Sequence, residues 1–486
     1  MSIRNAIKIS LLVEIMSKLI SFSTILIIAR ILTPEEIGVF AIVSSLTFIA
    51  VDLRFFGTGN YIVKEKEVTV EKQRSALGVG LGISYILGGA LYLSASSIAS
   101  FFDYSAMDTL FELMAISFFV APFYINPHSM MIKTFAFKKL GIINCLSQAV
   151  SATVTITLIH LGYSYYSLAM TMTVTILCQI CLSLVLVPQY TIFIPSFKNT
   201  KSILSFGGFN STAAILNRLS FLSPDLIIGK LGVARDVAMF SRGLGFMDFL
   251  SQVLTMGFRP IALPYLSESI NSGQDINNAY LRATNLLGSI CWPIIMVAAV
   301  SGYPIILFLF GPQWGESVPL VAFLGVWMTF KLVHILAPAL FMAANKPNLL
   351  FLQSFVVFLI TAFGILISYR FGLVNVAKSM AIAGVLEFAF VSFVLHKYFE
   401  LGFLKLLRSL ATNVLLTFTC LIATYLIDYI IVFSETPPLH SIIIIASINI
   451  PLWFVVTKCL RLEIYNEVSR AFRDLATFKS NKSASE

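Results

Sequence analysis

Apolar stretches of about twenty residues alternate with short polar breaks from near Ile9 to Leu460. As a helix, each stretch is long enough to cross a hydrocarbon core of roughly 30 Å. The pattern predicts an all-α polytopic membrane protein with about fourteen transmembrane helices. We place them near 9–29, 37–57, 76–98, 108–127, 142–160 and 165–187, then near 203–228, 236–258, 283–310, 317–341, 348–368 and 373–395, and finally near 409–432 and 440–458.

The polar breaks divide these helices into predicted domains. They are an N-terminal lobe of six helices (1–188), a cytoplasmic linker (189–202), a C-terminal lobe of six helices (203–397), two further helices (398–460) and a basic amphipathic tail (461–486). Proline breaks or bends a helix because it lacks the N–H and clashes with the preceding turn. We therefore expect breaks or bends at Pro122, Pro224, Pro293, Pro304 and Pro338.

An internal repeat relates the two lobes. The segment LIIARILTPEEIGVF, which begins at Leu26, returns as LIIGKLGVARDVAMF at Leu226. The match extends upstream in the same register, so that Lys18 corresponds to Arg218. Repeats of this kind are typical of transporters whose lobes enclose a substrate site near the bilayer midplane. The repeat predicts two cations at equal depth on opposite sides of a cleft, which suits an anionic cargo.

Composition supports a membrane protein and gives its orientation. Hydrophobic residues make up 58% of the 486 residues and charged residues 12%. Cationic loops tend to stay in the cytoplasm, and the loops on the N-terminal side of the bilayer hold most of the Lys and Arg. The opposite loops hold only Arg30, Lys230, Arg235 and Arg370. Both termini are therefore predicted to be cytoplasmic, and the net charge of +9 is a topology signal that does not indicate nucleic acid.

Charged residues inside the predicted spans are the main functional candidates, because an ionised group in the bilayer is costly unless it is paired or hydrated. The cations predicted to bind substrate are Lys18, Arg218, Arg54, Arg242 and Lys331. The carboxylates that could carry a coupling ion are Glu14, Asp52, Asp248 and Asp225, and the polar residues predicted to line the cavity are Asn60, Asn210 and Asn217.

Structural roles are open alternatives for several of these charges. Glu14 and Lys18 are four residues apart, so they can pair on one helix face. Arg54 lies near the predicted cytoplasmic end of its helix and can reach the lipid headgroups. Arg242 and Asp248 can form a buried salt bridge without a role in transport.

Three further residues have competing interpretations. Lys331 has no carboxylate near it in the sequence, so it requires a more distant partner or water. His334 is either sensitive to protons or held in a satisfied polar contact. Trp314 lies at a predicted outer interface, where tryptophan is common as an anchor.

Motifs for several enzyme classes are absent from the sequence. It has no G-x-x-x-x-G-K-[ST] phosphate loop, no G-x-S-x-G, no D-x-D and no histidines at metal-ligand spacing. The sequence therefore predicts a transporter that is not an enzyme, without a metal or cofactor apart from H⁺ or Na⁺ coupling.

The run ARILTPEEIGVFAIVSSLTFIA at Ala29 and the segment LFGPQW at Leu309 resemble the polysaccharide-export branch of the MOP exporter superfamily, in particular the Wzx-type oligosaccharide flippases. The resemblance implies a MATE-like, V-shaped pair of six-helix lobes around a central cationic cavity. In related lipid II flippases, cations on the first, second and eighth helices face that cavity. By helix and approximate depth, Lys18, Arg54, and Arg242 or Arg259 correspond to them.

The resemblance also implies a function. Such proteins move an undecaprenyl-pyrophosphate-linked O-antigen, capsule or exopolysaccharide unit across the bacterial inner membrane by alternating access, with a proton or sodium gradient as the suspected driving force. A polysaccharide polymerase and a ligase are the expected partners. A lipid II flippase, a multidrug or toxin extruder and a non-transporting envelope-assembly scaffold are the alternatives. The surplus of intramembrane Lys and Arg disfavours an extruder of organic cations.

Overall fold

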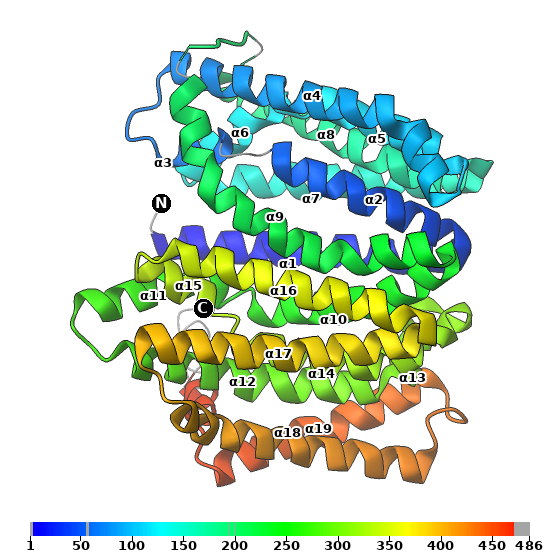
Figure 1. The fold of residues 1–486 in the computed structure, drawn as a ribbon, viewed down its shortest axis with the longest axis vertical. Coiled ribbons are helices and arrows are strands. Elements are labelled where there is room, and N and C mark those ends of the chain that lie inside the picture. The colour runs from blue at the N-terminus through cyan, green and yellow to red at the C-terminus, as the bar shows by residue number, and fades with distance from the viewer. Residues whose placement is uncertain (1–2, 55–57, 193, 199, 471–486) are drawn as a thin grey trace, which may run out of the picture. The chain divides into compact units, whose positions relative to one another are not determined.

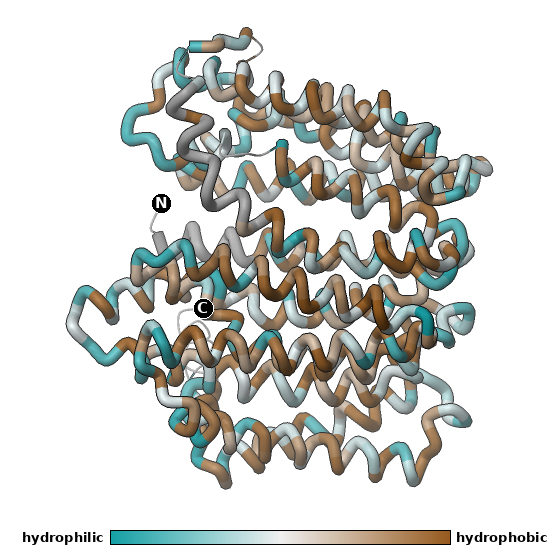
Figure 2. Tube along the Cα trace, in the orientation of Figure 1, coloured by the Kyte–Doolittle hydropathy of each residue, from teal (hydrophilic) through white to brown (hydrophobic). Residues whose placement is uncertain are grey.

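The computed structural model describes residues 3–54, 58–192, 194–198 and 200–470, with the side chains of residues 3–11 and of most residues between 201 and 214 outside this description. Every regular element in the described residues is helical (Figure 1). Hydrophilic residues gather at helix ends and in loops, whereas the middles of the helices are largely hydrophobic (Figure 2). The predicted all-α class is confirmed.

The chain forms two compact units. The first contains Met1–Ser241 and Ser354–Arg370. Its helices are α1 (Ile3–Ile31), α2 (Pro34–Arg54), α3 (Thr58–Lys64), α4 (Val70–Phe102), α5 (Ala106–Val120), α6 (Pro122–Lys133), α7 (Phe137–Leu158), α8 (Tyr166–Leu186), α9 (Thr200–Leu231), the start of α10 (Ala234–Thr255) and the end of α16 (Pro347–Ser368). Helix α7 packs on α1 and α8, α5 packs on α4 and α8, and α9 packs on α2.

The second unit contains Arg242–Gln353 and Phe371–Glu486. Besides the remaining parts of α10 and α16, its helices are α11 (Arg259–Asn271), α12 (Ile276–Val300), α13 (Gly302–Phe310), α14 (Val318–Val333), α15 (Ala337–Ala343), α17 (Leu373–Phe399), α18 (Phe403–Ile431) and α19 (Pro438–Cys459). Helix α14 packs on α12 and α17, and α18 packs on α12 and α19.

Eleven helices in the described residues are long and apolar enough to cross a membrane, or twelve if the bent pair α5–α6 is one span. The predicted spans near 203–228 and 236–258 correspond to α9 and α10, which are not among them. Both are long helices, but α10 carries Arg235, Asp236, Arg242 and Asp248. The most polar long helices are thus the two that carry many of the candidate site residues.

Helix boundaries repeat at the sequence offset of the internal repeat. Helix α1 ends at Ile31 and α9 at Leu231, and α2 begins at Pro34 and α10 at Ala234. The start of α2 is a capping box, in which the Thr33 N–H donates to Glu36 Oε2 (2.8 Å) and the Glu36 N–H donates to Thr33 Oγ1 (3.3 Å). The same segment of each repeat therefore forms a helix end, a short break and a new helix.

Prolines bend or start helices at three of the predicted positions. The axis turns by 54° between α5 and α6, where Pro122 begins α6. Pro304 and Pro338 lie in the first turns of α13 and α15, shortly after α12 and α14 have ended. In contrast, α9 and α12 continue through Pro224 and Pro293.

The predicted amphipathic tail is helical from Glu463 to Arg470, the last described residue. Arg282 on α12 donates to the Glu463 carboxylate from both Nε (2.8 Å to Oε1) and Nη2. Val468 lines an apolar pocket together with residues of α12, α18 and α19. The beginning of the tail is therefore attached to the second unit.

Gly38 on α2 allows close packing against the start of α10. A Cβ at this position would lie 1.8 Å from the Ala234 carbonyl oxygen, a backbone atom that cannot rotate away. We expect Gly38→Ala to destabilise the protein by about 1–3 kcal/mol through overpacking. The free energy of unfolding of the purified variant, compared with that of the natural protein, measures this effect. Gly82→Ala on α4 is the matched control, because nothing lies within 4 Å of its Cβ position; equal stability of the two variants would contradict the prediction.

Candidate functional site

An ion pair links the first and second lobes of the sequence within the first unit. Arg218 Nε on α9 lies 3.0 Å from Asp52 Oδ2 on α2, and the two side chains are 36% and 39% exposed. The Arg218 guanidinium also lies over the Phe48 ring, 5.4 Å from its centroid. One predicted substrate cation and one predicted ion-coupling carboxylate are thus partners of each other.

Helix α1 carries the other half of the predicted cation pair. Lys18 is half-buried and Glu14 is exposed on α1. A role of either residue in a cavity, and their pairing with each other, stay predictions.

Arg54 is buried, with 3% of its surface exposed at the end of α2. Its guanidinium lies 5.2 Å from the centroid of the Phe118 ring on α5. The alternative in which Arg54 reaches lipid headgroups is therefore wrong, because the side chain packs inside the first unit.

Asp225 bridges three helices in the first unit. Its Oδ2 accepts a hydrogen bond from Ser45 Oγ on α2 (2.8 Å), and its Oδ1 accepts one from Ser241 Oγ on α10. Two hydroxyl donors stabilise a carboxylate away from bulk water. This arrangement is compatible with the predicted coupling role and equally with a structural one.

The polar candidates differ in their surroundings. Asn217 Nδ2 donates to Ser354 Oγ on α16 (2.8 Å) and to the Ala213 carbonyl (3.1 Å). Asn60 is exposed on α3, and the Asn210 side chain lies outside the described residues. Asn217 therefore joins α9 to α16.

Arg242, in the second unit, lies on two aromatic rings. Its guanidinium is 4.4 Å from the Trp314 ring centroid and 4.9 Å from that of Phe310. Trp314 is fully buried, so its interpretation as a membrane-interface anchor is wrong. Arg242 Nε has no hydrogen-bond partner among the described residues. A guanidinium held by ring faces keeps its N–H donors for another acceptor.

Asp248 and Lys331 each contact a residue four positions away on the same helix, and Lys331 also has a carboxylate partner distant in sequence. Asp248 Oδ2 accepts a hydrogen bond from Gln252 Nε2 (2.5 Å), so Asp248 and Arg242 have different partners. Lys331 Nζ lies 4.6 Å from the centroid of the Trp327 ring. It also interacts electrostatically with Glu387, which is buried on α17.

His334 forms a satisfied polar contact, as one of its two interpretations expected. Its Nδ1 lies 2.9 Å from the Tyr280 hydroxyl and its Nε2 lies 2.9 Å from Ser392 Oγ. Only 3% of the residue is exposed. Among the described residues, no group of three or more His, Cys, Asp or Glu could hold a metal ion.

A cluster of contacts, here called the external clasp, joins the beginnings of α2 and α10 and the α4–α5 turn on the predicted external side. Arg235 Nη1 donates to Glu35 Oε1 (3.1 Å), and these residues occupy equivalent positions of the repeat. Lys230 Nζ lies 3.3 Å from Asp103 Oδ2, and the Ala234 N–H donates to the Tyr104 hydroxyl (2.7 Å). Apart from the repeat, no sequence pattern indicates these pairings.

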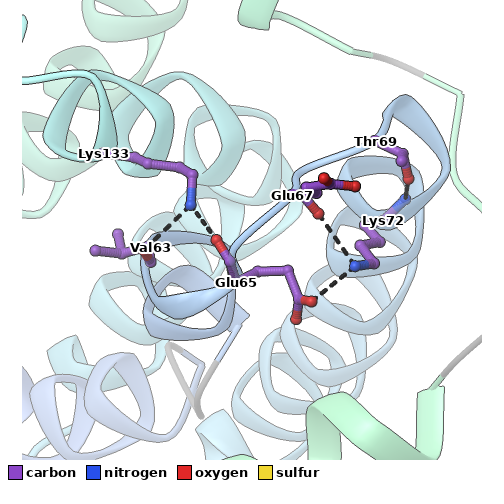
Figure 3. Close-up of polar contacts among 6 residues, drawn as sticks. All are labelled: Val63, Glu65, Glu67, Thr69, Lys72 and Lys133. Atoms are coloured by element: carbon purple, nitrogen blue, oxygen red, sulfur yellow. Dashed lines mark hydrogen bonds and ion pairs between the residues drawn. The ribbon is translucent and has the colours of Figure 1, made fainter.

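The loop between α3 and α4, on the predicted cytoplasmic side, is fixed by two lysines (Figure 3). Lys72 Nζ donates to Glu65 Oε1 (2.7 Å) and to the Glu67 carbonyl (3.1 Å). Lys133 Nζ, reaching from α6, donates to the Val63 carbonyl (3.4 Å) and to the Glu65 carbonyl. The hydrogen bond from Lys72 lowers the pKa of the Glu65 carboxyl from its usual 4.5.

This loop is expected to loosen in acid. A carboxyl group whose pKa is lower in the folded state contributes stability above its unfolded pKa and loses that contribution as the pH falls through the folded pKa. Amide hydrogen exchange in residues 65–72, corrected for intrinsic rates, should therefore accelerate below about pH 4.5. Glu65→Gln should remove this pH dependence, and an unchanged pH dependence in that variant would contradict the role of Glu65.

Comparisons with solved structures show which known fold the chain has. The chain is similar to the lipid II flippase MurJ in an inward closed conformation, with a TM-score of 0.71 and 12% identity over 93% of this chain and 99% of that one. It is also similar to a multidrug resistance MATE family transporter of the MOP superfamily in an inward-facing conformation, with a TM-score of 0.61 and 15% identity over 81% of this chain and 98% of that one. The protein is a multi-pass membrane protein with the MOP exporter fold.

The family follows from the sequence comparison. The polysaccharide biosynthesis protein family matches residues 27–319, which is more than half of the chain, and this chain belongs to that family. The predicted membership in the polysaccharide branch is thereby confirmed.

Two named relatives are distant in sequence. The succinoglycan biosynthesis transport protein ExoT of Rhizobium meliloti is 21% identical over 63% of this chain and 62% of its own length, so the match spans less than two thirds of that relative. The teichuronic acid biosynthesis protein TuaB of Bacillus subtilis is 20% identical over 74% of this chain and 75% of its own length.

Proposed function

We propose that this protein is a flippase that moves undecaprenyl-pyrophosphate-linked oligosaccharide from the inner to the outer leaflet of the bacterial inner membrane. The proposal rests on the surroundings of Arg218 and Arg242. Both guanidinium groups lie over aromatic rings, and the Nε–H donor of each has no hydrogen-bond partner among the described residues. Planar guanidinium groups suit phosphate oxygens. Membership of a polysaccharide biosynthesis family and arginines of this kind together favour a glycan carried on a phosphate-bearing lipid.

In this mechanism, Lys18 and Arg218 attract the pyrophosphate from the inner leaflet, and Arg54, Arg242 and Lys331 supply further positive charge. The lobes 1–188 and 203–397 then rock so that the site opens outward. The external clasp supports alternating access, because exposed ion pairs hold the beginnings of α2 and α10 together and are weak enough to break during a cycle. Protonation or Na⁺ binding at Glu14, Asp52, Asp225 or Asp248 would couple the cycle to an ion gradient.

Reconstitution tests the function. We expect purified protein in liposomes to translocate a fluorescent undecaprenyl-pyrophosphate oligosaccharide, measured as protection from an external quencher, and to do so faster with an imposed H⁺ or Na⁺ gradient. Efflux of a lipophilic organic cation with no translocation of the glycan lipid would instead identify a drug extruder. Absence of both activities with several glycans would favour a scaffold in an assembly with a polymerase and a ligase.

A further inference from the structure

Arg218 already has an anion beside it in the protein's own chain. Asp52 Oδ2 lies 3.0 Å from Arg218 Nε, and both side chains are more than one third exposed. The Phe48 ring faces the same guanidinium. The pair therefore lies where solvent and a ligand can reach it.

The pair is incomplete as a hydrogen-bonded contact. Although Asp52 Oδ2 is close, the buried Arg218 Nε has no hydrogen-bond partner among the described residues, so the approach balances charge without a directed bond. Strong arginine–carboxylate pairs use two parallel N–H···O bonds. A pyrophosphate offers more oxygens and more charge, so it can compete with Asp52 for this partly exposed guanidinium.

The internal repeat shows that this anion belongs to one lobe only. Lys18 is the equivalent of Arg218, whereas the equivalent of Asp52 is the neutral Gln252. Gln252 donates to Asp248 through Nε2. The repeat therefore keeps a cation at both positions, whereas the position of the Asp52 carboxylate holds a neutral amide in the second lobe.

We propose that Asp52 is a built-in competitor for the anion site of Arg218. In the cargo-free protein Asp52 holds Arg218, the incoming pyrophosphate displaces it, and its return to Arg218 assists release of the cargo. This proposal rests on the proposed function, since it takes the cargo to be a polyprenyl pyrophosphate. Asp52 is a positioning residue that acts through Arg218. It lowers the affinity for the pyrophosphate cargo, and the lower affinity permits release and turnover.

The test is the affinity for undecaprenyl pyrophosphate, measured with purified full-length protein in lipid nanodiscs. Asp52→Asn removes the competing charge, so binding should tighten about fivefold or more, within the usual range of coupling between sites. The gain should vanish in the double variant Asp52→Asn with Arg218→Ala. Asp52→Glu should bind about as the natural protein does, because it restores the carboxylate. In flipping assays, Asp52→Asn should lower the half-saturating concentration and also the turnover.

Control variants separate this effect from net charge and from misfolding. Glu71→Gln changes the net charge by the same amount, but Glu71 lies on the surface beside Lys198. The affinity of this variant for undecaprenyl pyrophosphate should therefore be unchanged. Asp52→Ser is a second neutral variant with the same expected gain, in case Asp52→Asn does not fold. If the natural protein binds the lipid and both neutral variants bind it equally or more weakly, the competitor role is wrong. If the natural protein does not bind it, the proposed function fails as well.

Discussion

Replacing both Lys18 and Arg218 by alanine should abolish flipping while membrane abundance stays normal. These residues are equivalent in the repeat and are the predicted contacts of the pyrophosphate. Hydrogen bonds to charged groups contribute about 1.5–3 kcal/mol each, so losing two should lower the translocation rate by about a hundredfold or more. The rate in proteoliposomes, normalised to reconstituted protein, measures the effect.

The control for this double variant removes the same charge elsewhere. Lys397 and Arg408 lie in predicted cytoplasmic regions, on α17 and α18. Alanine at both positions should leave flipping near the natural rate. Unimpaired flipping by the Lys18→Ala, Arg218→Ala variant would contradict the assignment of these two residues to the site.

Cross-linking the external clasp should stop transport. Glu35 and Arg235 form an ion pair at the beginnings of α2 and α10 (3.1 Å), and outward opening has to separate these helix ends. We expect Glu35→Cys with Arg235→Cys, joined by a short cleavable bifunctional thiol reagent in a background without the six native cysteines, to lose flipping at least about tenfold. Cleavage of the reagent should restore the rate.

Each single-cysteine variant, treated with the same reagent, controls for modification alone and should keep flipping. The cross-linked fraction is measured by mass spectrometry. Full activity of a completely cross-linked population would show that the clasp does not open during the cycle.

Much of the fold follows from the sequence because burial in a bilayer imposes long apolar segments. The apolar runs predicted the helices, and the repeat at Leu26 and Leu226 accounts for the matching ends of α1 and α9. The bend at Pro122 follows from the missing backbone N–H.

The partners of the site residues could not be predicted in this way. Asp52 and Arg218 lie on helices far apart in the sequence, and hydropathy does not indicate which faces meet. Burial of Arg54 against Phe118 depends on tertiary packing, which overrides the tendency of a terminal arginine to reach headgroups. The position of Trp314 at a predicted outer interface suggested an anchor, and only the structure shows its contact with Arg242.

The central claim is that the protein recognises the pyrophosphate of its lipid substrate. Two lipids that carry the same glycan can test it. One lipid has the undecaprenyl pyrophosphate linkage, and the other has a neutral linkage of similar length. Proteoliposomes with the natural protein should translocate only the pyrophosphate lipid, and this translocation should be lost in the Lys18→Ala, Arg218→Ala variant. Equal translocation of both lipids would contradict recognition of pyrophosphate by these cations.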